Sequence, residues 1–593
     1  MSDLHTFHIP VMGTAFTADT PLKVSHYGIN SVISIMDDVL LERLRKFYSD
    51  KNNLEYKEIK KNTIDYRADR ITSYLNLVND ITLQKFNSIV NSVSENFEEI
   101  KKYFEMLPDG SKIKKEFLEF TASNFNFNDL SNWLKENMSL GSIDVNIMTK
   151  VDKKNYFQNK ELPSEYNDAH AALRGYAKSN LSSSVIFSAG MNPRLYGYIA
   201  SFDDFFPDDN GYIKKKIVLK VSDFRSAIIQ GKFLAKKGLW VSEYRIESGL
   251  NCGGHAFATD GYLMGPILAE FRDKKMQLIK DTHLVYKEAL EKQKKYIPKQ
   301  PLNIKITAQG GVGTAKEHNF LIKHYNLDSV GWGTPFLLVP EVTTVDDETR
   351  SKLQKAKETD LYLSKISPLG VPFNHLRNTS AQNERIEKIQ KGKPGSSCPR
   401  RYLALGNEYG SQGVCTASRL YQKNKIKENK ITENILEKTC LCVGLAAASI
   451  INNNIDVNNE SKSVSICPGP NMAYYDKLLS LSQMTSFIYS GVENIVREDR
   501  PNLFLKELGL YTEYLKQKVS EHSENWERKS EKYLSNFICN IEEGAEYYQK
   551  LFKEFETTFS NIKVNVTNEL TNYLNNIKKI SNQIEALIEK NQK

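Results

Sequence analysis

The stretch LNIKITAQGGVG, residues 302–313, begins as a short run rich in β-branched residues and ends in a glycine-rich turn. A run of this kind is typical of a buried strand. The helix-like segment TAKEHNFLIKHY, residues 314–325, follows it, and LDSVGWGTPFLL, residues 327–338, repeats the strand and the small-residue turn. A strand, a helix and a second strand at this spacing predict a parallel β-α-β unit.

Six more strand-like runs precede this unit, and helix-like segments separate most of them. They are HIPVMGTAF (8–16), INSVISI (29–35), GSIDVNIMTK (141–150), SSVIFSAGMN (183–192), KKIVLKVSD (215–223) and GLWVSEYRIESG (238–249). Eight parallel strands, each followed by a helix, form the pattern of a (β/α)8 TIM barrel. We therefore predict an α/β fold with a TIM barrel over residues 1–345.

Three further segments depart from the barrel pattern. After the second strand, about residues 40–137 consist of charged amphipathic helices, which predict a helical insertion. Residues 346–500 hold most of the cysteines, and residues 501–593 are charged and helical with no strand signal. We expect these two segments to form a cysteine-rich region and a helical C-terminal region.

The composition fits a soluble globular protein, with 40% hydrophobic and 26% charged residues. No window approaches the ~18 apolar residues of a membrane span, and the first residues lack the pattern of a signal peptide. We therefore expect a cytoplasmic location, with cysteines as thiols or metal ligands rather than disulfides. The net charge of +8 permits an anionic ligand or nucleic acid but demands neither.

Two glycine-containing turns predict a phosphate site. In TIM barrels the chemistry lies at the carboxyl ends of the strands, and phosphate often binds after strands seven and eight. Here strand seven ends in AQGGVGT (308–314) and strand eight in GWGTPFL (331–337). Glycines let backbone N–H groups approach a phosphate, and the following helix N-terminus adds partial positive charge.

Together these motifs resemble the nitronate monooxygenase (2-nitropropane dioxygenase) family of FMN-dependent TIM barrels, which includes FMN-dependent enoyl reductases. The stretches IPVMGTAF, DVNIM, SAGMNP, GLNCGGHAF, AQGGVGT and GWGTPFL occur in the family's order. The resemblance implies that FMN is the cofactor. The residues that it places around FMN are Met12, Gly13, Asn146, Lys220, Gly253 and Gly254 near the flavin, and Gly311, Gly313, Gly333 and Thr334 at the phosphate.

The resemblance makes His255 the proton donor or acceptor, and an imidazole with an ordinary pKa near 6.5 suits that role. The alternative is a structural histidine that caps the loop. Where the family commonly has Glu-Ala before Gly-Gly-His, this chain has Asn251 and Cys252. This departure predicts a different substrate pocket.

Five of the seven cysteines lie in the cysteine-rich region, and three interpretations remain open for them. They are Cys398, Cys415, Cys440, Cys442 and Cys467. In the first interpretation, Cys398, Cys415, Cys467 and one of Cys440 or Cys442 bind an iron–sulfur cluster, [4Fe-4S] in the simplest case. In the second interpretation the cysteines bind a structural zinc ion, and in the third they are buried free thiols.

The leading hypothesis is an FMN-dependent oxidoreductase, a reductase or dehydrogenase rather than a monooxygenase, with hydride transfer through flavin N5. An iron–sulfur cluster would carry single electrons to or from the flavin. The expected partners are a small-molecule substrate, an electron-donor protein or NAD(P)H, and a second copy of the chain. One alternative is a flavin-dependent RNA-modifying enzyme of the dihydrouridine synthase type, although no clustered basic and aromatic pattern argues for nucleic acid. A second alternative is a non-catalytic scaffold that binds partners.

Overall fold

Eight parallel strands form one sheet in the order β1-β10-β9-β8-β7-β6-β3-β2. Ile9 forms a parallel bridge with Ser31, and its N–H donates to the Asn30 carbonyl at 2.9 Å, so the two edge strands meet. The TIM barrel prediction is confirmed. The strands are β1 (Phe7–His8), β2 (Ser31–Ser34), β3 (Ile143–Met148), β6 (Ser184–Ser188), β7 (Lys216–Val221), β8 (Val241–Glu247), β9 (Lys305–Gln309) and β10 (Ser329–Gly331).

The computed structural model describes residues 4–122, 126–188, 190–253, 260–458, 460–492, 495–524, 527–559 and 566–592. Within this part, β1 is shorter than the sequence predicts and begins one residue earlier. Pro10 has no N–H to donate to a ladder, and Gly13 turns the chain with a φ of +79°. The stretch after His8 is therefore mostly a loop at the end of the barrel.

The barrel strands alternate between apolar side chains that face outward and polar side chains that face inward. On β7, Ile217 and Leu219 belong to the main hydrophobic core, whereas Lys216 and Lys220 line cavities inside the barrel. TIM barrels are usually filled by bulky branched residues. Here the inward apolar residues form a small separate cluster of Val32, Ile186 and Val218. The barrel is therefore hollow and polar on either side of this layer.

The predicted helical insertion lies between β2 and β3, and α3 packs against α2 and α7. The first helices are α1 (Thr20–Val24), α2 (Asp38–Lys51), α3 (Tyr66–Asn91), α4 (Phe97–Glu105), α5 (Lys112–Ala122) and α6 (Phe127–Asn137). Those that follow the later strands are α7 (Asp168–Ala177), α8 (Pro193–Ile199), α9 (Phe224–Ala235), α10 (Met264–Lys292) and α11 (Ala315–His324). A small hairpin of β4 (Tyr156–Phe157) and β5 (Lys160–Glu161) precedes α7.

The cysteine-rich region packs on the carboxyl end of the barrel. The Ala15 N–H donates to the Leu445 carbonyl at 3.1 Å, and the Ser449 hydroxyl donates to the Ala15 carbonyl at 3.2 Å. The elements of this region are α12 (Asp347–Lys355), β11 (Leu361–Ser364), β12 (Phe373–Leu376), α13 (Ser380–Gln390), α14 (Arg419–Lys427), α15 (Glu433–Glu437), α16 (Leu441–Gly444), α17 (Ala447–Asn452) and α18 (Leu481–Ser490).

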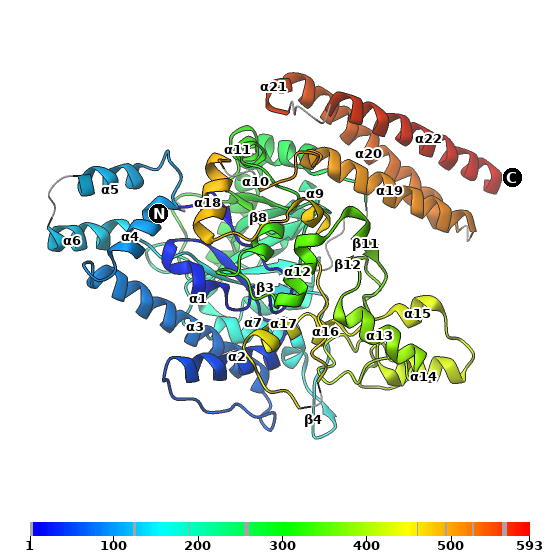
Figure 1. Ribbon diagram of the computed structural model, residues 1–593, viewed down its shortest axis with the longest axis horizontal. Helices are drawn as coiled ribbons and strands as arrows, with labels where there is room; N and C mark the ends of the chain where they lie inside the picture. The colour runs from blue at the N-terminus through cyan, green and yellow to red at the C-terminus, as the bar shows by residue number, and fades with distance from the viewer. Residues whose placement is uncertain are drawn as a thin grey trace.

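The C-terminal region consists of α19 (Leu503–Glu524), α20 (Arg528–Glu554), the short α21 (Glu556–Phe559) and α22 (Val566–Gln592). The three long helices pack against one another, and α20 also contacts α10 of the barrel (Figure 1). Within the described ranges, no helix combines the length and the apolar character that crossing a membrane requires.

Candidate active site at the carboxyl end of the barrel

A cavity of about 130 Å³ lies at the carboxyl ends of the barrel strands, and we call it the mouth cavity. The last residues of β2, β3, β6 and β8 line it, together with polar side chains one or two positions before a strand end. These barrel residues are Ser34, Asn146, Met148, Ser188, Lys220 and Glu247. The cysteine-rich region supplies the other side through Tyr402, Leu403, Leu441, Cys442 and Leu445.

Glu247 organises the polar wall of the mouth cavity. Its Oε1 accepts hydrogen bonds from Lys220 Nζ at 2.9 Å, Asn251 Nδ2 at 2.6 Å and Gln309 Nε2 at 2.8 Å. The Lys220 side chain is only 7% exposed, so its charge is compensated by Glu247 rather than by water. Lys220 was predicted from the sequence and Glu247 was not, although both occupy inward positions at strand ends.

Asn146 reaches the mouth cavity from β3 and is 4% exposed. Its Oδ1 is buried and has no hydrogen-bond partner within the described part of the chain. A buried acceptor without a partner is costly, because the folded chain does not replace the hydrogen bonds it made to water. Asn146 Oδ1 is therefore ready to accept a hydrogen bond from a ligand.

Gly253 brings the loop after β8 against the loop after β1. Its φ is +92°, and a Cβ atom at this position would lie 2.6 Å from Met12 Cα and 2.7 Å from the Val11 carbonyl oxygen. Gly253 and Gly13 both line the mouth cavity, and Met12 is buried beside them. Gly254 and the predicted catalytic residue His255 lie outside the described residues.

The predicted phosphate loop after β9 is occupied by the chain itself. Glu317 Oε2 accepts the Gly313 N–H at 2.8 Å, and Glu317 Oε1 pairs with Arg500 Nη1 at 2.9 Å. Arg500 also donates to the Gly311 carbonyl at 2.5 Å, and Asn471 Nδ2 donates to the same carbonyl at 2.7 Å. A carboxylate thus takes the position at the helix N-terminus where an anionic ligand would otherwise bind.

The second predicted phosphate loop is covered as well. Thr334 Oγ1 donates to the Pro468 carbonyl at 2.9 Å, and a Cβ atom at Gly333 would lie 2.4 Å from Cys252 Sγ. Among the described residues that line the mouth cavity, none comes from either phosphate loop. As the chain is folded, these loops do not fit the phosphate of FMN.

Four of the five cysteines in the cysteine-rich region come together, in two pairs. The Cys398 and Cys415 side chains hydrogen-bond to each other, as do those of Cys440 and Cys442. These contacts lower the pKa of the Cys398 and Cys440 thiols, and backbone N–H groups of Arg401 and Val443 contribute. Cys442 interacts electrostatically with both members of the other pair and lines the mouth cavity.

Cys467 does not join these four thiols but lies beside Cys252, one of the two cysteines outside the cysteine-rich region. Burial, with the neighbouring Cys467, raises the pKa of the Cys252 thiol to about 12. The Gly253 N–H donates to the Cys467 carbonyl at 3.0 Å. Over the described ranges, no group of three or more His, Cys, Asp or Glu side chains is placed to hold a metal ion.

No protein-family model and no curated protein matches this chain. Among solved structures, the enoyl reductase domain of MlnA from the macrolactin biosynthesis cluster of Bacillus amyloliquefaciens is 12% identical, with a TM-score of 0.30 over 74% of this chain and 88% of that chain. A nitroalkane oxidase from Streptomyces ansochromogenes is 11% identical, with a TM-score of 0.29 over 76% of this chain and 98% of that chain. At these values neither likeness bears on function, so the assignment rests on the residues of this chain.

Proposed function

We propose that the protein is an oxidoreductase that acts on a small organic molecule in the mouth cavity. The observation that carries the proposal is the polar wall at the carboxyl ends of the strands, where TIM barrel enzymes place their chemistry. There, the partly buried Lys220–Glu247 pair lines the same cavity as Asn146, whose Oδ1 has no partner among the described residues. The redox class rests on the sequence resemblance to FMN-dependent barrels.

Lys220 is suited to stabilise negative charge that develops on the reacting molecule. Its ammonium group is held in a largely buried site, where electrostatic stabilisation is stronger than in water. Glu247 fixes the position of the ammonium group, and Asn251 and Gln309 fix the carboxylate. Asn146 adds an acceptor that can orient the molecule, and His255 remains the predicted proton donor or acceptor.

FMN fits one half of the site and not the other. Asn146, Ser188 and Lys220 give the mouth cavity polar groups that suit the edge of the flavin ring of FMN. When bound, FMN would supply the redox chemistry. The phosphate loops, however, are filled by Glu317, Arg500 and the loop that carries Pro468. We therefore assign no step of the reaction to FMN, and the cofactor remains a prediction of the sequence resemblance.

The test of the proposed function is NAD(P)H-dependent reduction of a dye acceptor by purified protein, with and without added FMN. We expect turnover, and we expect Lys220→Met to lower it by about 10²-fold, the usual effect of removing one electrostatic stabiliser. Lys232→Met is the matched control, because Lys232 pairs with Asp281 at the partly exposed surface.

Absence of turnover in both preparations, together with no flavin absorption after incubation with FMN, would contradict the proposal. Equal turnover of the Lys220 and Lys232 variants would remove the role of Lys220. The predicted partners, an electron donor and a second copy of the chain, remain predictions.

The four paired cysteines support a second part of the proposal, an iron–sulfur centre that they would hold and that would supply single-electron transfer to a molecule bound in the mouth cavity. Cys398, Cys415 and the Cys440–Cys442 pair come from three separate stretches, and backbone N–H groups already point at their sulfurs. The two pairs would have to close around a cluster, because no described group is placed to hold a metal ion. Cys442 would then stand between the cluster and the cavity that it lines.

Iron and sulfide analysis after anaerobic purification tests this second part. We expect iron and sulfide to be present, to be lost in Cys415→Ser and to be kept in Cys467→Ser, because Cys467 lies with Cys252 instead. Protein without iron, or equal iron in the two variants, would overturn it. The dye assay is separate, so the two parts of the proposal can fail independently.

A further inference from the structure

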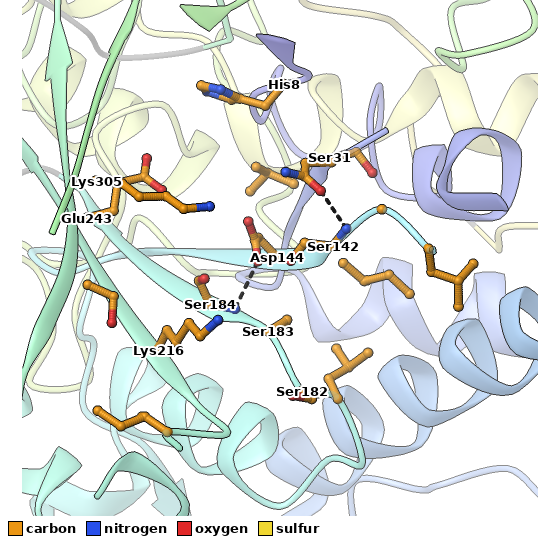
Figure 2. Close-up of a pocket in the computed structure, with 18 of the residues that line it drawn as sticks. His8, Ser31, Ser142, Asp144, Ser182, Ser183, Ser184, Lys216, Glu243 and Lys305 are labelled. Carbon is orange, nitrogen blue, oxygen red and sulfur yellow. Dashed lines mark hydrogen bonds between the residues drawn. The ribbon is translucent and has the colours of Figure 1, made fainter. Parts of the chain in front are cut away.

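A second and larger cavity, of about 780 Å³, opens at the amino ends of the barrel strands, and we call it the amino-end cavity (Figure 2). The first residues of six strands line it: Ser31, Ile143, Ser184, Lys216, Lys305 and Ser329. The apolar layer of Val32, Ile186 and Val218 lies within the barrel, between these strand starts and the residues of the mouth cavity. The amino-end cavity is thus a separate site at the opposite end of the barrel.

The amino-end cavity exists because small and polar residues replace the bulky apolar residues that usually fill a TIM barrel. Its outer wall comes from the helical insertion and the loops before the strands, through Asn79 and Leu83 of α3 and through Tyr212. Its volume lies in the ~300–1,000 Å³ range of small-molecule sites. This end of a TIM barrel ordinarily contributes to stability through a packed core. A cavity of this size in its place indicates a binding site for a ligand.

The carboxylates in the wall are already engaged by other groups. Asp144 Oδ1 accepts from Ser142 Oγ at 2.5 Å and from the Ser184 N–H at 2.9 Å. Glu243 Oε1 pairs with Arg245 Nη2 at 2.7 Å and accepts from Thr307 Oγ1 at 2.5 Å. Figure 2 shows His8, Asp144, Lys216, Glu243 and Lys305 arranged around the cavity.

Two groups in the wall lack partners within the described residues, and both are able to donate hydrogen bonds. They are Arg245 Nη1 and Ser31 Oγ, and each belongs to a side chain that is at least nine-tenths buried. Arg245 is a donor only. His8 is engaged on both sides, because its Nδ1 lies 2.9 Å from Ser329 Oγ and its ring also interacts with the Gln309 side chain.

Cationic side chains outnumber carboxylates in the wall of the amino-end cavity, where Arg245, Lys216 and Lys305 stand with Asp144 and Glu243. Burial, followed by the charges of Arg245, Lys220 and Lys305, lowers the pKa of His8 well below its ordinary value. Of the lysines, Lys305 and Lys216 line the amino-end cavity, and Lys216 is exposed at its rim, whereas Lys220 lines the mouth cavity. An excess of positive charge together with unsatisfied donors suits an acceptor-rich anionic group.

We propose that the amino-end cavity binds a small polar molecule through an oxyanion group, a carboxylate or a phosphate. Arg245 supplies the buried donor, and Lys305 and Lys216 hold the anion from β9 and β7. This site is distinct from the reaction site proposed above and does not depend on the chemistry assigned there.

The experiment is isothermal titration of the full chain with inorganic phosphate and with succinate, which separate the phosphate and carboxylate sources. We expect one saturable site for one of the two probes. Lys305→Gln and Lys216→Gln should each weaken that binding by about tenfold, while Lys236→Gln should leave it unchanged because Lys236 lies at the exposed end of α9. Ligand-induced stabilisation in thermal unfolding provides an independent readout for each variant.

Absence of saturable binding by both probes would overturn the proposal, as would equal affinity of the Lys305 and Lys236 variants. Lys216 is exposed, so its replacement should not disturb folding and keeps the test valid if the Lys305 variant is unstable. The mouth-cavity variant Lys220→Met should still bind the probe. A loss of binding in that variant would contradict the separation of the two sites.

Discussion

The candidate active site requires glycine at position 253 for two reasons. The backbone of Gly253 is in the left-handed region, and it lies directly against the loop after β1. We expect Gly253→Ala to lower the free energy of unfolding by about 2 kcal/mol or more, since an L side chain is strained at a φ of +92° and would strike Met12. Urea unfolding followed by circular dichroism measures the change.

Gly110→Ala is the control at the same scale. Its φ is not positive, and no described atom outside its chain neighbours lies within 4 Å of a Cβ atom built there. Its effect should stay within about 0.5 kcal/mol. Similar decreases in the free energy of unfolding for both variants would mean that the close approach of Gly253 to Met12 does not require glycine at this position.

At the scale of elements, Glu507 joins three helices. Its Oε2 on α19 accepts from the Met264 N–H at the start of α10 at 2.9 Å and from Tyr548 Oη on α20 at 3.0 Å. Burial raises the pKa of Glu507 to about 7. Because this folded-state pKa lies above the unfolded value of about 4.3, the folded state binds the proton more tightly.

Glu507 should therefore make the stability depend on pH. Its contribution is fully present below about pH 4.3 and is lost as the pH rises through about 7, on the order of 3 kcal/mol in all. We expect Glu507→Gln to lose this component, whereas Glu513→Gln on the exposed side of α19 keeps it. Urea unfolding at pH values between 4.5 and 8 checks the prediction, and parallel curves for the two variants would contradict it.

At the scale of the whole molecule, Arg400 fastens the cysteine-rich region to the barrel. Its guanidinium group pairs with Asp37, just before α2, and with Glu460 at 3.1 Å. All three side chains are largely buried, with Arg400 only 1% exposed. Tyr402 also donates to Asp37 Oδ1, at 3.1 Å. The side of the mouth cavity that residues 346–500 supply is thus held to the start of α2 by the Arg400–Asp37 ion pair.

We expect Arg400→Met to lower the free energy of unfolding by about 3 to 5 kcal/mol, because it removes the buried guanidinium group that pairs with Asp37 and leaves Glu460 with Arg43 alone. Limited proteolysis should then cut residues 346–500 faster. Arg43→Met is the matched control, since Arg43 pairs with the same Glu460 but is 23% exposed, and its loss should be about 1 kcal/mol or less. Equal proteolysis of both variants would show that the ion pair does not fasten the region.

The barrel was predictable from the sequence because its strands are short runs of β-branched residues that end in small-residue turns. The inward polar positions were also open to sequence analysis, since Glu243, Arg245 and Glu247 alternate with outward residues along VSEYRIE. The predicted phosphate loops remain a prediction, and the sequence could not show which side chains lie against them. Glycine turns were recognised correctly, but the Arg500 that fills one of them lies 189 residues from Gly311 along the chain.

The sequence by itself determined the eight strands, the helical insertion and the position of Lys220 at a strand end, because local periodicity and turn residues specify these features. Only the tertiary structure decided the partners of the buried charges, such as Glu247 for Lys220 and Asp37 for Arg400. It also decided which four cysteines come together and where the barrel is hollow. These outcomes depend on contacts between distant segments, and a desolvated charge takes whichever opposite charge the fold brings to it.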